Sequence, residues 1–220
     1  MHPLHDISVG PNPPERINVY IEIPRGERNK YEIDKETGAL RFDRLLYSAV
    51  HYPGDYGFIP RTLAQDGDAL DVLVLITAPT FPGCLMEVRP LGMFQMRDEK
   101  GVDEKVLAVP VSDPFMEGYH NLDQVPPHTL REIDHFFAVY KELEGKETHT
   151  GGWQDREAAY GAIEAAMRRY RAPSTPGCSS CATTARCRCA RCSSPRSTTP
   201  RTAIRSCRAS ARRLRRSRRC

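Results

Sequence analysis

The stretch Asp66-Gly-Asp-Ala-Leu-Asp-Val-Leu-Val-Leu-Ile76 places three carboxylates directly before five apolar residues. A short apolar run that follows turn residues is typical of a fully buried strand. At a separation of about 4 Å and an effective dielectric constant near 20, two like charges repel by roughly 4 kcal/mol. We therefore expect a cation among the carboxylates of Asp66, Asp68 and Asp71, at the mouth of a buried strand.

The chemistry of these three side chains favours a hard metal ion. Carboxylate oxygens select Mg²⁺, Mn²⁺ or Ca²⁺, whereas zinc prefers nitrogen and sulfur ligands. A solvated acidic turn is the alternative, and it is the commoner role of an isolated Asp-Gly-Asp sequence. An EF-hand loop is excluded, because it would need Asp or Asn at the position of Leu70 and Gly at that of Asp71.

Alternation of apolar and polar residues predicts further strands on both sides of this stretch, at residues 17–23, 30–33, 39–42, 85–94 and 105–111. Residues 52–60 are rich in Tyr, Pro and Gly, and we expect them to form a loop. A helical period appears only late, in a helix with Thr129 as its N-cap and in a second helix at about residues 154–171. This order predicts an α+β fold, a small β-barrel packed on its side by two helices.

The net charge of +4 is an average over two segments of opposite charge. Residues 173–220 carry +13, with Arg as their only charged residue type, whereas residues 1–172 carry −9. The basic segment also holds seven of the eight cysteines and leaves only Cys84 to the acidic body. One thiol in a body of this size indicates a reducing, cytoplasmic location, and we expect neither a signal peptide nor a membrane span.

These shifts divide the chain into an N-terminal arm at residues 1–16, which we expect to be irregular, an acidic body at 17–172 and a tail at 173–220, which we expect to be disordered. The tail has too few apolar residues to offset the entropy of ordering. Its composition matches out-of-frame translation of a GC-rich gene, so a frameshift product is our preferred interpretation. The alternatives are a nucleic-acid-binding tail and a metal knuckle of paired cysteines such as Cys178 and Cys181.

Other polar residues of the body complement the acidic stretch. Further carboxylates lie on predicted strands and hairpins, where each taken singly is more often exposed to solvent: Glu22, Glu32, Asp98 and Asp103. Cationic and phenolic residues accompany them: Lys30, Arg44, Tyr56, Lys105, Tyr140 and Lys141. Carboxylate-bound metal ions facing Lys, Arg and Tyr donors would clamp a highly charged phosphate. For Tyr140, which lies on an apolar helical stripe, packing in the core is the alternative.

In these residues the chain resembles one family, the soluble family I inorganic pyrophosphatases of bacterial type. The matching segments run in order over about residues 17–171: 21–24, 29–34, 43–44, 52–59, 66–74, 89–92, 96–99, 103–105, 109–110, 135–137 and 140–143. Ala69 replaces the proline of the family's Asp-Gly-Asp-Pro motif, a change that removes no ligand. The resemblance implies an OB-like five-stranded barrel with flanking C-terminal helices, and residues 17–172 as the catalytic domain.

The resemblance also implies the reaction, hydrolysis of pyrophosphate to two orthophosphates with several Mg²⁺ ions, or Mn²⁺, in each site. Asp68 would be the base that takes a proton from the attacking water. The metal ligands would be Asp66, Asp71, Asp98, Asp103, Glu22 and Glu32. Phosphate oxygens would be held by Lys30, Arg44, Tyr56, Lys105, Tyr140 and Lys141. Bacterial relatives imply a homohexamer in the cytoplasm.

A nucleic-acid-binding OB-like protein with a basic tail is the alternative function. OB barrels bind single strands through aromatic platforms and a positively charged groove. The acidic body would repel such a polyanion unless metal ions intervened, so nucleic acid could bind only through the tail. The enzyme hypothesis therefore predicts that a chain ending at Ala172 keeps its activity, whereas the binding hypothesis predicts that this truncation abolishes it.

Overall fold

The computed structural model describes residues 1–99 and 101–172, so the expectations for the tail fall outside the described residues. Its strands are β1 (Ile17–Ile23), β2 (Asn29–Ile33), β3 (Leu40–Leu45), β4 (Asp55–Phe58), β5 (Asp71–Val74), β6 (Leu85–Asp98), β7 (Gly101–Pro110) and β8 (His149–Gln154). Its α-helices are α1 (Pro3–Asp6), α2 (Pro127–Val139) and α3 (Arg156–Arg171). Single 3₁₀ turns occupy Pro114–Met116, Leu122–Gln124 and Glu142–Glu144.

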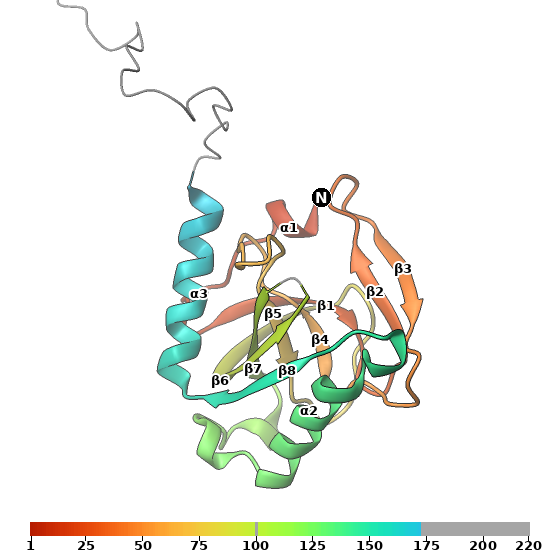
Figure 1. Cartoon of the computed structure of the whole chain (residues 1–220). Coiled ribbons are helices and arrows are strands. Elements are labelled where there is room, and N and C mark those ends of the chain that lie inside the picture. The colour runs from red at the N-terminus through yellow and green to blue at the C-terminus, as the bar shows by residue number, and fades with distance from the viewer. Residues whose placement is uncertain (100, 173–220) are drawn as a thin grey trace, which may run out of the picture. The chain divides into compact units, whose positions relative to one another are not determined.

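Five strands close into a barrel. The main sheet runs in the order β1-β4-β5-β7-β6, and an additional pairing between β1 and β6 closes the ring (Figure 1). Strand β8 extends the sheet from β6, and β2 and β3 form a separate antiparallel hairpin. The predicted α+β fold with a five-stranded barrel and C-terminal helices is confirmed.

The two faces of β5 explain how the helices are placed. Val72 and Val74 on one face belong to a core that includes Ile163 of α3. Leu73, between them, belongs to a second core that includes Phe137 of α2. Because successive side chains of a strand point to opposite faces, one apolar run serves both cores. Helices α3 and α2 accordingly lie on different sides of the barrel (Figure 1).

The pairing of β5 with β7 positions the functional residues. These two strands are parallel, and their register sets Asp71 level with Lys105. Strand β4 pairs antiparallel with the other edge of β5, so that Tyr56 lies opposite Leu73. The acidic stretch at residues 66–71 therefore enters the sheet between β4 and β7, which carry the polar side chains of Tyr56 and Lys105.

Two strands were not expected from the sequence. Strand β4 lies inside residues 52–60, where we predicted a loop, because Gly57 permits close backbone approach rather than a turn. A Cβ at this position would lie 1.9 Å from the carbonyl oxygen of Tyr20 on β1. Strand β8 contains Gly151 and Gly152, which have low strand propensity. Its pairing with β6 makes it a strand although its composition does not predict one.

The helix boundaries also differ from the prediction. Helix α2 begins before Thr129, with Pro126 as its N-cap and Pro127 in the first turn, where a missing N–H is tolerated. Helix α3 begins after its N-cap Asp155, whose side chain accepts a hydrogen bond from the Ala158 N–H. One helical turn, α1, interrupts the arm expected to be irregular.

Among the described residues, no helix is long and apolar enough to cross a membrane.

Candidate active site

A cavity of about 420 Å³ opens between the barrel, the β2–β3 hairpin and the chain that follows α2. All thirteen site residues named from the sequence line this cavity: Glu22, Lys30, Glu32, Arg44, Tyr56, Asp66, Asp68, Asp71, Asp98, Asp103, Lys105, Tyr140 and Lys141. The structure thus brings together side chains that lie up to about 120 positions apart in the sequence.

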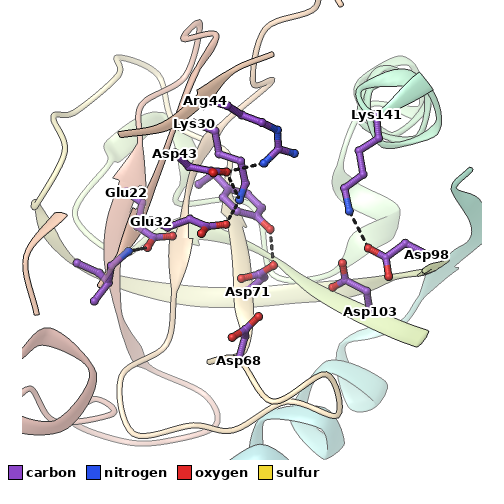
Figure 2. Close-up of polar contacts among 12 residues, drawn as sticks. Glu22, Lys30, Glu32, Asp43, Arg44, Asp68, Asp71, Asp98, Asp103 and Lys141 are labelled. Atoms are coloured by element: carbon purple, nitrogen blue, oxygen red, sulfur yellow. Dashed lines mark hydrogen bonds and ion pairs between the residues drawn. The ribbon is translucent and has the colours of Figure 1, made fainter. Parts of the chain in front are cut away.

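The charges that line this cavity do not balance. Its lining residues include nine carboxyl groups but only six basic side chains. Figure 2 shows the ion pairs in separate groups, one around Lys30 on the hairpin and another where Lys141 meets Asp98. The Lys141 Nζ lies 2.7 Å from Asp98 Oδ2, and both side chains are largely buried. Carboxylates therefore outnumber the cations available to neutralise them.

Lys105 is the buried cation of the barrel side of the cavity. It is only 3% exposed, and its Nζ lies 2.8 Å from Asp71 Oδ2 and 2.9 Å from Asp103 Oδ2. It also donates to the Tyr56 hydroxyl at 2.9 Å, and that hydroxyl donates to Asp71. Burial is the largest single influence and favours the neutral amine, but Asp71, Tyr56 and Asp103 together outweigh it and raise the pKa of Lys105 well above its usual range.

Burial acts on the carboxyl groups in the opposite direction. The pKa of Asp103 is raised because the side chain is largely buried and Asp71 lies nearby, despite the attraction of Lys105. The pKa of Glu22 is raised to about 8, chiefly by burial and then by the charge of Asp71. Glu22 Oε1 accepts a hydrogen bond from the Ile33 N–H at 2.8 Å, which holds this carboxyl group at the base of the hairpin.

The β2–β3 hairpin supplies the opposite wall. Its register pairs Lys30 with Arg44, so two cations lie side by side at the cavity. Lys30 forms ion pairs with Glu32 and Asp43, and Arg44 also pairs with Asp43. The Arg44 Nε lies 2.8 Å from Glu144 Oε1, which ties the hairpin to the chain after α2.

Tyr140 is packed in the core and also lines the cavity, so its phosphate-binding role stays a prediction. Its ring is buried and stacks on Phe136, and it meets Phe137 edge to face. The residue nevertheless lines the cavity, and its ring centroid lies 5.4 Å from the Lys141 Nζ. Packing therefore fixes a phenol whose neighbour is a cavity cation.

Several lining residues received no role from the sequence. They include Leu4, Lys35, Asp43, Glu99 and Lys146. Asp43 could have been found from its place beside Arg44 in a matched segment, and Glu99 from its place beside Asp98. Leu4 and Lys35 carry no such signal, because tertiary structure alone brings them to the cavity.

The donor set fits hard divalent cations. In the structurally described part of the chain, no three acidic, His or Cys side chains are arranged as a metal site. Asp71 and Asp103 both contact the single ammonium of Lys105, and their roles as metal ligands, like that of Asp66, stay a prediction. Oxygen donors and excess negative charge are features that suit hard cations such as Mg²⁺.

Comparison with known proteins identifies the family. Residues 19–171 match the family model described as inorganic pyrophosphatase. An inorganic pyrophosphatase of Methanosarcina mazei is 55% identical over 152 residues, which cover 69% of this chain and 90% of that protein. One of Halalkalibacterium halodurans is 48% identical over 158 residues, which cover 72% and 97%.

Solved structures agree with the sequence relatives. The crystal structure of inorganic pyrophosphatase from Thermus thermophilus has a TM-score of 0.74 and 47% identity, covering 76% of this chain and 98% of that one. The Helicobacter pylori enzyme has a TM-score of 0.72 and 40% identity, covering 75% and 98%. A family match over most of the acidic body, relatives near 50% identity and a shared barrel show that this chain belongs to the inorganic pyrophosphatase family.

Proposed function

We propose that the cavity between the barrel and the hairpin is where this chain hydrolyses pyrophosphate to two orthophosphates. Hydrolysis of pyrophosphate is the activity of the family to which the chain belongs. The observation that carries the proposal is the excess of carboxyl groups in one cavity that is also lined by Lys, Arg and Tyr. A pyrophosphate anion would be repelled by such a wall unless divalent cations accompany it.

Members of this family depend on metal ions, and we assign Mg²⁺, with Mn²⁺ as a substitute, to this cavity. The carboxylates that would hold these ions are Asp66, Asp71, Asp98, Asp103, Glu22 and Glu32. When bound, divalent cations lower the pKa of coordinated water and neutralise phosphate charge. The buried carboxyl groups supply oxygen donors, which are the ligands that these cations prefer.

Asp68 is the proposed general base. It lines the cavity from the turn that precedes β5, and its backbone N–H donates to Asp66 Oδ1 at 3.0 Å. This hydrogen bond fixes the base relative to a proposed metal ligand two residues away. A carboxylate so held can accept the proton of the attacking water as the new P–O bond forms.

The cationic and phenolic side chains would bind the phosphate oxygens. Lys30 and Arg44 face the cavity from the hairpin, Lys105 and Tyr56 from the barrel, and Lys141 and Tyr140 from the end of α2. Carboxylates hold each of the lysines and Arg44 in the free protein. Charged donors fixed before the substrate arrives can stabilise developing charge without reorganisation.

Orthophosphate release from pyrophosphate in the presence of Mg²⁺ tests this function. We expect the wild-type chain to turn over, and Asp68→Asn to lower kcat by at least about 100-fold with the fold intact, because general-base catalysis contributes typically 10²–10⁴-fold. Circular dichroism and the thermal midpoint of unfolding verify that the variant is folded. Unchanged turnover in Asp68→Asn would remove Asp68 as the base.

The remaining assignments concern the whole chain. We propose that residues 17–172 form the catalytic domain, that the enzyme is cytoplasmic and that it assembles as a homohexamer. A chain ending at Ala172 should keep the full kcat and elute at the mass of six copies when measured by light scattering. A monomeric mass with full activity would contradict the hexamer, and loss of activity on truncation would contradict the domain assignment.

The intact mass of the cellular protein tests whether residues 173–220 are a frameshift product. A mass that includes this segment would contradict that interpretation.

A further inference from the structure

The turn between β2 and β3 carries a lysine directly to the proposed base. Lys35 forms an ion pair with Asp68, and its Nζ lies 3.4 Å from the Gly67 carbonyl oxygen. Both Lys35 and Asp68 line the cavity. The lysine thus reaches a side chain and a backbone oxygen of the acidic turn from a hairpin that is more than 30 residues earlier in the sequence.

The turn itself is rigid because Asp34 caps it. Asp34 Oδ1 accepts hydrogen bonds from the N–H groups of Glu36 at 3.1 Å and Thr37 at 2.9 Å. Arg41 on β3 donates to Asp34 Oδ2 at 2.8 Å, and this bond is the main reason that the pKa of Asp34 is lowered. The backbone from which Lys35 projects is therefore fixed from both sides.

The N-terminal arm contacts the same turn through His2. The His2 Nε2 lies 3.2 Å from the Lys35 carbonyl oxygen. The His2 ring also packs so closely on Gly38 that a Cβ there would come within 2.9 Å of it, and Gly38 has a φ of +70°. Only glycine adopts this conformation without strain while leaving room for the ring. The arm therefore packs closely against the turn that carries Lys35.

The arm is in turn anchored to the loop that leads into the acidic turn. The backbone N–H of Arg61 donates a hydrogen bond to the Leu4 carbonyl oxygen of the arm at 3.0 Å. Its Nε donates to the His5 carbonyl oxygen at 2.8 Å, and it has a φ of +54°, a left-handed conformation that is rare for an arginine. Strain of this kind persists where surrounding structure enforces it, often near functional sites. Leu4, held in this way, lines the cavity.

We propose that Lys35 is a positioning residue for Asp68, and that the N-terminal arm holds the turn from which Lys35 reaches it. The inference rests on the proposed role of Asp68 as base. The ion pair restricts rotation of the Asp68 carboxylate, and the contact with Gly67 ties the lysine to the backbone of the same turn. A misplaced base lowers the rate of proton transfer strongly, because catalysis depends on reacting groups being held in the productive geometry.

Substitution of Lys35 should change the free energy of unfolding very little, so a fall in kcat would not reflect unfolding. The Lys35 side chain is 63% exposed, and exposed ion pairs contribute little to the free energy of unfolding. Arg168 on α3 provides a matched control, since it is 68% exposed, forms an ion pair with Glu164 and does not line the cavity. Arg168→Gln should leave both kcat and KM at wild-type values.

Steady-state hydrolysis of pyrophosphate with saturating Mg²⁺ measures the effect. We expect Lys35→Gln to lower kcat about tenfold with little change in KM, and Lys35→Arg to restore most of the loss because it keeps the charge. In an Asp68→Asn background, Lys35→Gln should cause no further fall. A rise in KM at constant kcat would overturn the proposal, because it would show that Lys35 binds substrate instead.

Two further outcomes separate this proposal from the proposed function. If Asp68→Asn cripples turnover but Lys35→Gln keeps the wild-type kcat, the positioning role fails alone. If Asp68→Asn keeps the wild-type kcat, the base assignment fails and the positioning role fails with it.

The role of the arm is tested separately. His2→Ala should lower kcat by less than Lys35→Gln does, and it should have no effect in the Lys35→Gln background. A wild-type kcat in His2→Ala would overturn the role of the arm.

Discussion

Lys105 shows how a single side chain organises the acidic wall of the cavity. Its ammonium lies within 3.0 Å of oxygens from Asp71, Asp103 and Tyr56. Removing one partner of a buried ion pair is strongly destabilising, by about 3–5 kcal/mol, because the other charge is left without compensation. In this case two carboxylates would lose their nearest cation.

We therefore expect Lys105→Met to lower the free energy of unfolding by about 3 kcal/mol in the metal-free protein. Urea unfolding in the presence of EDTA measures this change. Adding Mg²⁺ should restore part of the loss, because divalent cations supply the missing positive charge. The double variant Asp71→Asn with Lys105→Met should be less destabilised than Lys105→Met alone. Equal destabilisation of the single and double variants would contradict the account.

Glu22 predicts a pH dependence of stability. Its pKa in the folded protein is raised from 4.5 to about 8, and the residue is 8% exposed. A raised pKa means that the folded state binds the proton more tightly than the unfolded state does. The contribution of Glu22 is therefore complete below about pH 4.3, the unfolded value, and is lost as the pH rises through the folded value.

The corresponding measurement compares the metal-free wild type with Glu22→Gln between pH 5 and pH 9. We expect the wild type to lose stability relative to the variant as the pH rises toward about 8, and the difference to level off above that pH. Glutamine keeps an oxygen that can accept the Ile33 N–H but has no charge to bury. A stability difference that is constant across this range would show that Glu22 does not titrate in this way.

At the scale of elements, glycine in β4 decides whether the barrel closes. Gly57 packs against the backbone of β1, where a Cβ would lie 1.9 Å from the Tyr20 carbonyl oxygen. Gly161 in α3 offers the matched case, because a Cβ there would meet nothing within 4 Å. The same substitution should therefore have opposite effects at these two positions.

Gly57→Ala should lower the free energy of unfolding by at least about 3 kcal/mol, since the backbones of β1 and β4 must separate. Gly161→Ala should raise it by about 0.5–1 kcal/mol, as expected for a compatible helical position. Thermal and urea unfolding of both variants give the comparison. If Gly57→Ala were as stable as the wild type, the close approach of the two strands would be refuted.

The elements also show what the sequence could predict. Alternation and apolar runs identified β1, β5, β6 and β7, each of which has buried side chains on at least one face. The Gly-containing turn between two short alternating segments identified the β2–β3 hairpin. Strand β4 was missed because Gly57 suggests a turn, while the real reason for the glycine is a neighbouring backbone. Strand β8 was missed because its glycines give it little strand propensity. The start of α2 was placed too late, since Thr129 is a good N-cap residue in isolation.

The cavity itself could be predicted only in part. Its thirteen named residues came from their chemistry and their individual roles from the resemblance to a family, and the structure gathers all of them at one cavity. Lys35 and the arm were not predicted, because nothing in the spacing of Lys35 relates it to Asp68. The capture of Asp71 and Asp103 by Lys105 was also not predicted, since that geometry follows from the parallel register of β5 and β7.

At the scale of the whole molecule, the acidic cavity should couple metal binding to folding. Each lysine that lines the described cavity has a carboxylate partner, yet carboxyl groups remain in excess. A ligand that binds only the folded state stabilises it by about 2.7 kcal/mol at a concentration of 100 times its Kd. Saturating Mg²⁺ should therefore raise the thermal midpoint by several degrees, and EDTA should reverse the rise. An unchanged midpoint would indicate that folding does not create the metal site.

Mg²⁺ binding by isothermal titration calorimetry, comparing the wild type with Asp71→Asn and Asp103→Asn, tests the central claim most directly. Both variants replace a cavity carboxylate with a neutral side chain of the same shape, and Glu164→Gln on α3 is the control for an exposed charge outside the cavity. We predict that each cavity variant weakens Mg²⁺ binding at least about tenfold, a loss of 1.4 kcal/mol or more, while the control binds as the wild type does. Wild-type affinity in both cavity variants would contradict the claim that these carboxylates hold the divalent cations on which pyrophosphate hydrolysis depends.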